Sequence, residues 1–301
     1  MIVTRLIGGL GNQLFQYAYG LCLAEQSQLP LYLDDSAFKT YTLHALDIDR
    51  FAVTAERLPD GLRSRVPGRY RGASRLRDWL DQKTGRSLTL RREKPFGYQT
   101  RYLAPKADLY LDGYWQSERF FPGVEQRLRE EFRPVESLSD ESLRIADDMQ
   151  RTEGVAVHVR RGDYVTDPEA ARVFRTVGAD YYRACLQDLA AAVSGLQVFL
   201  FSNDIPWCLE NLDVGLPFTP VVHNDATTAW EDLMLMGQCR HAVIANSSFS
   251  WWGAWLGAQH ADRRVYHPDP WFNPGTLDGS ALGCESWISE SDLKTPRREA
   301  A

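Results

Sequence analysis

The chain has 301 residues, which suits two domains of about 150 residues each. Apolar residues make up 44% and charged residues 25%, a balance that excludes disordered and fibrous proteins. The formal net charge of −6 argues against binding nucleic acid over a broad surface, so we expect no nucleic-acid partner.

Cysteine usage and hydropathy indicate a cytoplasmic protein. The five cysteines are odd in number and form no C-x-x-C pair, which fits reduced thiols better than a disulfide framework or a zinc site. The first residues lack the shape of a signal peptide. The uncharged stretch 242–259 contains Asn246 and several serines, which is typical of a buried strand, turn and helix rather than of a membrane span.

Charge is concentrated in one segment of the N-terminal half. Residues 57–94 hold 12 Lys or Arg and 4 Asp or Glu, a local charge of +8. The simplest interpretation is a solvated helical insertion. The alternative is a basic patch that contacts an anionic glycan or the inner leaflet of a membrane, as a peripheral membrane protein would.

The N-terminal half begins with a strand, a turn, a helix and a second strand. We expect a strand over residues 2–7, a turn at 8–11, and a helix from an Asn12 cap to about residue 27. A short strand over 30–33 would end at Asp34 and Asp35. These elements predict an N-terminal domain over residues 1–150, with the basic insertion near 57–94.

Strands and helices alternate in the C-terminal half, residues 151–301. The expected strands cover 155–160, 196–201, 219–222, 241–245 and 264–267, and the expected helices cover 139–151, 180–193, 206–212, 228–238 and 248–258. Thr228 and Glu231 have the spacing of a capping box. Such alternation predicts α/β architecture with two doubly wound parallel-sheet domains facing a cleft, and ligands beyond the carboxyl ends of the strands.

The first group of candidate residues follows the strand at 155–160. His158 and Arg160 should point to one side of that strand and Arg161 to the other. Arginines at a strand end can bind a phosphate without a metal, and Asp163 could hold one guanidinium in place. The alternative is a surface ion pair between arginine and aspartate.

Two further groups follow later strands. Asp204 could accept two hydrogen bonds from a guanine, or it could simply cap the helix that begins near Pro206. Asn246, Ser247, Ser248 and Ser250 lie between a strand and a helix, where free backbone N–H groups and hydroxyls can bind an anion. The adjacent pair Trp251 and Trp252 is more typical of a core than of a stacking platform.

The glycine-rich turn at residues 8–11 is the fourth group. It begins like the dinucleotide-binding fingerprint, but Leu14 occupies the position of the third glycine. Gly11, Asn12 and Gln13 remain candidates for contact with a ligand. The pair Asp47 and Asp49 has the D-x-D spacing of metal-nucleotide sites, although two acids in a loop are usually solvated.

Together these groups resemble the α-1,2-fucosyltransferases of glycosyltransferase family 11. Four ordered blocks carry the resemblance: residues 8–18, 158–164, 201–208 and 232–256. The resemblance implies a GT-B-like fold, GDP-L-fucose as donor, inversion at the anomeric carbon and no metal or other cofactor. Asn203 departs from the Asp common in the family, and residues 57–131 match nothing, so the acceptor is not implied.

The resemblance also implies roles for single residues. Arg160 maps to the phosphate-contacting arginine, His158 and Asp204 to groups beside the guanine, and Ser247 to Ser250 to hydroxyls beside the phosphates. Residues 1–150 would then bind the acceptor and residues 151–301 the nucleotide sugar, with Gly11, Asn12 and Gln13 near the reaction centre.

This chemistry needs a stabilised leaving group and an acceptor hydroxyl that loses its proton. Arg160, Arg161 and the helix start at Ser247 and Ser248 would stabilise the departing GDP, and Asn246 and Ser250 are further donor-binding candidates. Asp163 is the first candidate for the base, followed by Asp34, Asp35 and His158, and a dissociative step without a strong base is also open.

The expected reaction is transfer of fucose to the 2-hydroxyl of a terminal galactose, on a glycan that could be linked to a lipid. Three alternatives remain open at this point. They are a glycosyltransferase with another nucleotide sugar, an NAD(P)-linked oxidoreductase that uses the turn at Gly9 and Gly11, and a non-catalytic glycan-binding protein.

Overall fold

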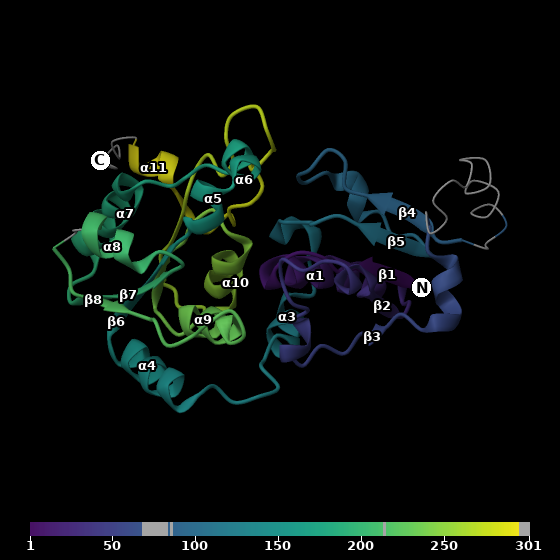
Figure 1. Cartoon of the computed structure of the whole chain (residues 1–301), viewed down its shortest axis with the longest axis horizontal. Helices are drawn as coiled ribbons and strands as arrows, with labels where there is room; N and C mark the ends of the chain where they lie inside the picture. The colour runs from purple at the N-terminus through teal and green to yellow at the C-terminus, as the bar shows by residue number, and fades with distance from the viewer. Residues whose placement is uncertain (68–83, 85–86, 213–214, 295–301) are drawn as a thin grey trace. The chain divides into compact units, whose positions relative to one another are not determined.

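The computed structural model describes residues 1–67, 84, 87–212 and 215–294 (Figure 1). The chain divides into two compact units, Met1–Val135 (unit 1) and Glu136–Ala301 (unit 2). Each unit contains one parallel sheet with helices, so the predicted α/β class is confirmed. Nearly half of the basic segment 57–94, namely residues 68–83 and 85–86, lies outside the described residues.

Unit 1 is built on a five-stranded sheet in the order β3-β2-β1-β5-β4, with every neighbouring pair parallel. Its strands are β1 (Ile2–Arg5), β2 (Leu31–Asp34), β3 (Glu56–Arg57), β4 (Thr89–Arg92) and β5 (Leu109–Asp112). Its α-helices are α1 (Leu10–Ser27) and α3 (Glu125–Glu131), and its 3-10 helices are Ser36–Lys39, Ile48–Arg50, Asp60–Arg65, Thr100–Leu103 and Glu118–Phe120.

Helix α1 begins three residues earlier than the sequence predicts. Its N-cap is Gly9, without a side-chain hydrogen bond, and Asn12 lies inside the first turn, so the predicted Asn12 cap is wrong. Gly8, with φ of +87°, makes the turn between β1 and the helix, and a Cβ there would lie 2.6 Å from Asn12 Nδ2. The backbone of this turn therefore requires glycine at position 8, and the helix begins without a capping side chain.

Two buried glutamines of α1 hold the loops that follow the strands. Gln13 Nε2 donates to the carbonyls of Gly8 (2.9 Å) and Ala45 (2.8 Å), and its Oε1 accepts from the N–H groups of Asp47 (3.0 Å) and Ile48 (3.1 Å). Gln16 likewise bridges the loop after β1 and the turn after β5, through Ile7 and Gly113. One amide side chain satisfies buried donors and acceptors together, which makes these loops rigid.

Unit 2 has a six-stranded sheet in the order β11-β10-β9-β6-β7-β8, again parallel throughout. The strands are β6 (Glu153–Val159), β7 (Leu196–Ser202), β8 (Phe218–Pro220), β9 (His241–Val243), β10 (Val265–His267) and β11 (Ile288–Ser289). The helices are α4 (Asp140–Arg151), α5 (Gly162–Thr166), α6 (Pro168–Val173), α7 (Ala179–Ala192), α8 (Ile205–Asn211), α9 (Ala229–Met236), α10 (Ser248–Leu256) and α11 (Glu290–Lys294).

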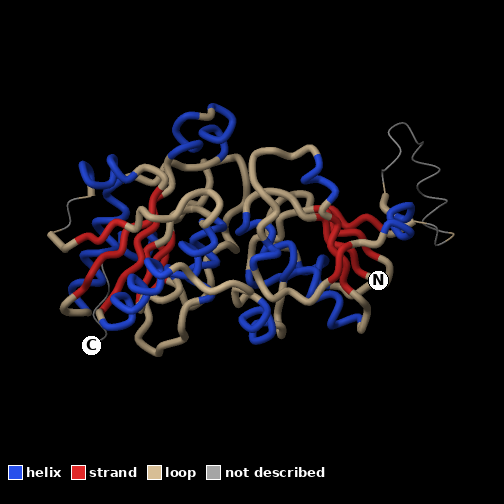
Figure 2. Tube along the Cα trace, turned by 60° about the horizontal axis from the view of Figure 1, so that its bottom comes forward, coloured by secondary structure: helices blue, strands red, loops and turns tan. Residues whose placement is uncertain are grey.

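Helices cover both faces of the unit 2 sheet, as the strands and helices of Figure 2 illustrate. Val155, Val157 and Val159 of β6 pack on one face against residues of α7 and α8. Ala156 and the β7 residues Phe199 and Phe201 pack on the other face against α4 and α9. The period of two along each strand therefore sends alternate side chains into two separate cores, which is the doubly wound arrangement that the sequence predicts.

The boundary between the units lies after Val135, not after residue 150 as predicted. Helix α4 packs on β6 and α9, so it belongs to unit 2. The predicted capping box is also wrong. Thr228 is the N-cap of α9, but the carboxylate of Glu231 accepts from the N–H (3.0 Å) and hydroxyl (2.8 Å) of Ser139, the N-cap of α4.

All five cysteines are buried free thiols. Within the described chain, no helix combines the length and the apolarity that crossing a membrane requires.

The bridging role of Gln13 predicts a large stability loss on truncation. Gln13→Ala leaves two backbone carbonyls and two N–H groups of the buried loops without partners. We expect the free energy of unfolding in urea to fall by about 3 kcal/mol. Gln126→Ala, on the exposed side of α3, is the matched control and should change the stability by less than about 0.5 kcal/mol. Equal effects of the two substitutions would contradict the bridging role.

A second prediction concerns Asp232 of α9. Burial raises its pKa to about 6, although the hydrogen bond from Asn224 and the charge of His223 oppose the shift. The folded chain therefore holds this proton more tightly than the unfolded chain, and stability falls as the pH rises from about 4 to about 6. Asp232→Asn should unfold at wild-type denaturant concentrations at pH 4, but be more stable by about 2 kcal/mol at pH 7. The same difference at both pH values would contradict this assignment.

Candidate active site

In the sheet of unit 2, the strand order reverses between β6 and β9. From the central strand β6, the chain proceeds through β7 and β8 on one side and through β9, β10 and β11 on the other. The connections that follow β6 and β9 therefore leave in opposite directions, and ligands of open α/β sheets bind beyond the carboxyl ends of such strands. The predicted group at residues 158–164 spans the end of β6 and the turn after it, and the group at 246–250 follows β9 (Figure 1).

His158 lies on the α10 side of β6. Its ring is 6.0 Å from the ring of Phe249, and only 7% of the residue is exposed. Burial, together with the charge of Arg160, lowers the pKa of His158 to about 3, so the imidazole is neutral at physiological pH. Within the described residues its buried Nδ1 has no hydrogen-bond partner, which leaves one ring nitrogen able to bind a polar group.

Arg160 contacts Tyr164, and Tyr164 joins the segment after β6 to the segment after β9. Its guanidinium carbon is 5.6 Å from the centre of the Tyr164 ring, and that ring stacks on Phe174 at 4.5 Å. The Tyr164 hydroxyl donates to the carbonyl of Asn246 at 3.1 Å. Tyr164 therefore links the turn that carries Arg160 to the residue that precedes Ser247.

Asn246 holds three loops together rather than pointing its amide nitrogen at a ligand. Its Nδ2 donates to the carbonyls of Arg175 (2.7 Å) and Trp271 (2.9 Å), and the residue is 1% exposed. Its Oδ1 is buried without a partner in the part of the chain that the structure describes.

Arg161 points to the opposite side of β6, as the strand period predicts. Its guanidinium lies 3.9 Å from the ring centre of Trp207, and its Nε is 3.3 Å from Asp204 Oδ2. Its backbone N–H donates to Asn203 Oδ1 at 2.9 Å. The two neighbouring arginines therefore have different surroundings, and those of Arg161 join the ends of β6 and β7.

Gly162 permits this close approach. Its φ is +27°, and a Cβ there would lie 2.2 Å from Asn203 Nδ2. A larger residue would have to displace the Asn203 amide, whose Oδ1 accepts from the Arg161 N–H, and would be strained at this φ.

Asp204 caps helix α8, the simpler of the two roles considered for it. Its Oδ1 accepts from the N–H of Trp207 at 3.2 Å, while its Oδ2 pairs with Arg161. Both carboxylate oxygens thus already have protein partners, and a contact with guanine stays a prediction.

The four polar residues at the start of α10 are not equivalent. Ser247 is the N-cap, and its Oγ accepts from the N–H of Phe249 at 3.3 Å. Ser248 is half-buried at the first helical position. Ser250 is fully buried and donates to the Ser247 carbonyl, and Trp251 and Trp252 are core residues with no exposed surface. The backbone N–H groups at this helix start, with Ser248, can accommodate an anion.

The remaining predicted residues lie elsewhere. The side chain of Asp163, at the start of α5, is outside the described part of the structure. In unit 1, Gly11 is buried, Gln13 is used by the loops, and Asn12 Oδ1 accepts from Gln116 Nε2 at 2.6 Å. That contact joins the first turn of α1 to the loop that follows β5.

Three of the candidate bases have protein partners or an unsuitable pKa. Asp34 accepts from the Tyr110 hydroxyl (2.8 Å) and lies 3.6 Å from Arg63, and Asp35 lies 3.5 Å from Arg57. His158 is a weak base because of its lowered pKa.

The D-x-D pair does not form a metal site in unit 1. Asp49 forms an ion pair with Arg57, and no group of three His, Cys, Asp or Glu in the described ranges could hold a metal ion. Whether catalysis needs a metal stays a separate prediction.

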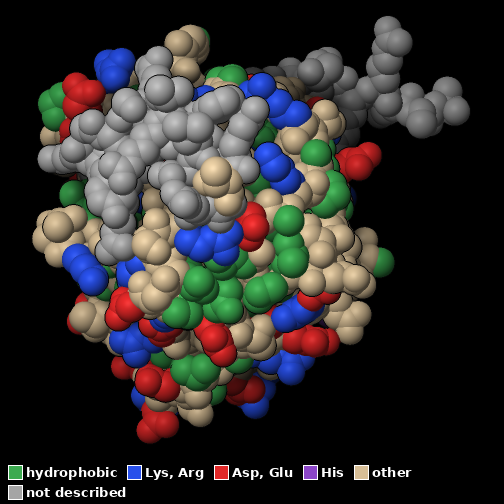
Figure 3. All heavy atoms as spheres, turned by 90° about the vertical axis from the view of Figure 1, so that its right-hand side faces the viewer, with side chains coloured by type: hydrophobic (Ala, Val, Ile, Leu, Met, Phe, Trp, Pro, Cys, Tyr) green, Lys and Arg blue, Asp and Glu red, His purple; other side chains and the backbone are tan. Residues whose placement is uncertain are grey.

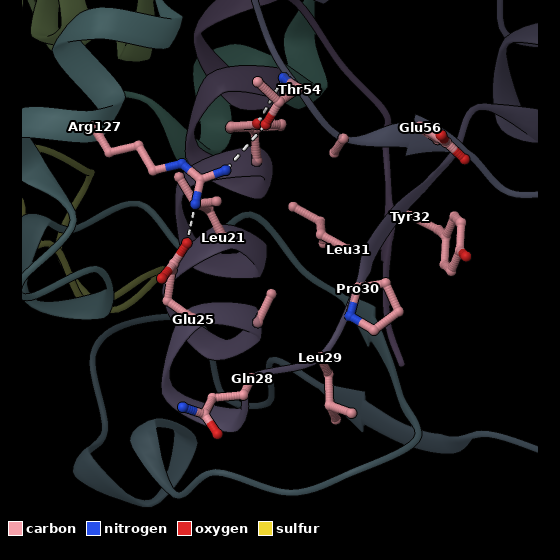
Figure 4. Close-up of a pocket in the computed structure, with 13 residues that line it drawn as sticks. Leu21, Glu25, Gln28, Leu29, Pro30, Leu31, Tyr32, Thr54, Glu56 and Arg127 are labelled. Carbon is pink, nitrogen blue, oxygen red and sulfur yellow. Dashed lines mark hydrogen bonds and ion pairs between the residues drawn. The ribbon is translucent and has the colours of Figure 1, made fainter.

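A cavity of about 590 Å³ in unit 1 is lined by none of the predicted site residues (Figure 4). It is lined by the last turn of α1 and by Pro30, Leu31 and Tyr32, so it is at the amino end of β2. Arg127 points toward Glu25 and Thr54 in Figure 4 and pairs with both. Its charge is already neutralised, so this cavity lacks the groups that a phosphate ligand needs.

Sequence reasoning missed Tyr164 and Trp207, the two aromatic residues that contact the arginines. Tyr164 lies in the block 158–164 that carries the family resemblance, but its hydrogen-bond partner Asn246 is 82 positions away in the sequence. Trp207 follows Asp204 by three residues in the first turn of α8, and that spacing is the available signal.

The sequence profile of the family described as Glycosyl transferase family 11 matches residues 86–263. The chain is 31% identical over 296 residues to an alpha-1,2-colitosyltransferase of Escherichia coli, covering 96% of this chain and 98% of that protein. It is also 31% identical over 259 residues to galactoside alpha-(1,2)-fucosyltransferase 1 of Homo sapiens, covering 83% of this chain and 63% of that protein.

A solved structure supports the same fold. The structure of POFUT1 in complex with GDP superposes with a TM-score of 0.51 at 14% identity, over 88% of this chain and 97% of that one. This likeness shows the fold alone, and the predicted GT-B-like class is confirmed. Leu14, which stands where the dinucleotide-binding fingerprint has its third glycine, is fully buried in α1. The chain therefore lacks that fingerprint. On these matches in sequence and fold, the chain belongs to glycosyltransferase family 11.

Proposed function

We propose that the protein transfers L-fucose from GDP-L-fucose to the 2-hydroxyl of a terminal galactose on a glycan, with inversion and without a metal. The observation that carries the proposal is the position of Arg160 at the point where the strand order reverses, linked through Tyr164 to the segment that begins α10. The relatives named for α-1,2 transfer of fucose and colitose support the reaction class.

In the proposed mechanism, residues of unit 2 bind the leaving group, GDP. Breaking the bond between C1 of the sugar and the diphosphate places negative charge on GDP. Arg160 and the N–H groups at the start of α10 stabilise that charge from fixed positions, which removes the need for a divalent cation. His158 and Asp204 contribute to the base side of the donor, and the unpartnered Nδ1 of His158 is a suitable acceptor for a nucleotide N–H or O–H.

The acceptor hydroxyl attacks from the opposite face of the sugar and loses its proton. Asp163 is the proposed base, since Asp34 and Asp35 are held by arginines and His158 has a low pKa. Unit 1 is proposed to bind the acceptor through the turns that contain Gly11, Asn12 and Gln116, and the glycan is proposed to be carried on a lipid. Peripheral membrane contact through residues 57–94 stays a prediction, since much of that segment lies outside the described residues.

One observation favours a second donor. A relative with 31% identity is named a colitosyltransferase, so GDP-colitose is the alternative nucleotide sugar.

The role of Arg160 predicts a selective loss of activity. Arg160→Ala should lower kcat/KM by about 100-fold or more, because it removes a fixed cation from the leaving group. Arg151→Ala, on the exposed side of α4, is the matched control and should retain activity. Both variants should unfold within about 2 °C of the wild type. Near-normal transfer by a folded Arg160→Ala protein would refute the assignment.

A substrate panel tests the reaction itself. The chain is incubated with GDP-L-fucose, GDP-colitose or a UDP-sugar, and with lactose or 2-deoxygalactosyl glucose as acceptors, each with and without EDTA. We expect transfer from GDP-L-fucose to lactose, no product on the 2-deoxy acceptor, and no effect of EDTA. Faster transfer from GDP-colitose would select the second donor. Product only from the UDP-sugar, or loss of transfer in EDTA, would contradict the proposal.

A further inference from the structure

A second cavity in unit 1, of about 380 Å³, is lined by cations. It lies along the edge strand β4, beside β5 in Figure 1, and includes Tyr102 and the start of β5. Its charged lining residues are all positive, and they are Arg91, Arg92, Lys94, Arg101 and Lys106. Figure 3 shows that Lys and Arg side chains (blue) are spread over the face drawn, interspersed with Asp and Glu (red). We call this cavity the β4 pocket.

Two of these five cations, Arg91 and Arg92, already have structural partners. Arg91 donates to the carbonyls of Tyr102 (2.7 Å) and Ala104 (2.8 Å), which fixes the segment that closes the pocket. Arg92 pairs through its Nε with Asp112 at 2.8 Å, so one carboxylate outside the lining offsets one of the five charges.

Three cations remain available. Lys94 and Lys106 are exposed, and no ion pair of either ammonium group occurs within the described ranges. Arg101 stacks on Tyr102 with its guanidinium carbon 4.9 Å from the ring centre, and donates from Nη2 to the Lys94 carbonyl at 2.7 Å. The buried Tyr102 hydroxyl also accepts from the Lys94 N–H at 2.9 Å, so the backbone that carries these cations is fixed.

Like charges on a fixed backbone repel one another unless an anion neutralises them. Ammonium groups bind phosphates as point charges, and the guanidinium fork adds directed hydrogen bonds. A ligand with two adjacent phosphates carries several negative charges, which the three available cations can offset together.

We propose that the β4 pocket binds the diphosphate that links a glycan acceptor to its carrier lipid. This inference rests on the proposed function, because it places the acceptor carrier on unit 1. It assigns the recognition of the carrier to Lys94, Arg101 and Lys106, apart from the residues proposed to bind the donor in unit 2. The diphosphate would hold the acceptor through its carrier, whatever sugars lie between the carrier and the reacting galactose.

The first test measures inorganic diphosphate binding by calorimetry in saturating GDP, which occupies the proposed donor site. The variant is Lys94→Glu/Lys106→Glu, since neither side chain makes a described structural contact. The control, Arg144→Glu/Arg151→Glu on α4, changes the net charge by the same −4, two units per residue. We expect about tenfold weaker diphosphate binding for the pocket variant and no change for the control. Equal affinities for all three proteins would overturn the proposal.

The second test separates a lipid-linked diphosphate from free diphosphate. Transfer is measured to one galactoside in two forms, either free or joined to a short isoprenyl diphosphate. In the pocket variant, KM for the isoprenyl diphosphate acceptor should rise about tenfold while KM for the free galactoside and both kcat values stay the same. An unchanged KM for the isoprenyl diphosphate acceptor would mean that the pocket binds free diphosphate only, and would overturn the assignment.

The two proposals fail in different ways. If no donor supports transfer to either acceptor, the proposed function is wrong, and inorganic diphosphate binding without GDP still decides whether the β4 pocket binds this anion.

Discussion

The central position of β6 in a parallel sheet is the constraint on which the candidate site depends. Chain segments leave β6 and its neighbour β9 in opposite directions, so the carboxyl ends of these two strands have no crossover between them. The period of two along β6 then separates its polar residues. His158 lies on the α10 side, while Arg161 lies on the α8 side and is held by Trp207 and Asp204. The end of one strand thus sends a buried histidine to one side and an anchored arginine to the other.

Uncharged amides hold the turns around the strand ends in both units. Gln13 and Gln16 do so in unit 1, and Asn203 and Asn246 do so in unit 2. An amide can satisfy an N–H and a carbonyl at once, and burying it costs less than burying a charge. Fastening by amides therefore holds these turns without burying a charge.

Much of the fold could be predicted from local patterns, and the exceptions have physical reasons. The same tetrapeptide, Leu-Tyr-Leu-Asp, forms β2 and β5, yet only the first was predicted because a helix and a proline precede it. Strand β4 reads Thr-Leu-Arg-Arg, and an edge strand with exposed arginines lacks the apolar run of a central strand. The capping box failed because Glu231 bonds to Ser139, a partner 92 positions away that no local pattern reveals.

The same distinction applies to the candidate site. The divergence of Arg160 and Arg161 follows from strand geometry alone, so it could be predicted. The contact between Tyr164 and Asn246, and the inward orientation of Ser250, depend on how β6, β9 and α10 pack, so they could not. The side chain of Asp163 lies outside the described residues, and its role stays a prediction.

The anchoring of residues 45–48 by Gln13 has a consequence for how this protein could be redesigned. The anchor fixes only the last part of the connection between β2 and the 3-10 helix Ile48–Arg50, and at Leu43, which is 75% exposed, the same connection packs little against the rest of the chain. Thr42 and Leu43 are therefore the positions of this connection that can be exchanged, since Tyr41 packs its ring on Phe38 and His44. A library built on these two positions would vary the loop whose His44 lies beside Gly9 while the anchored framework keeps its hydrogen bonds.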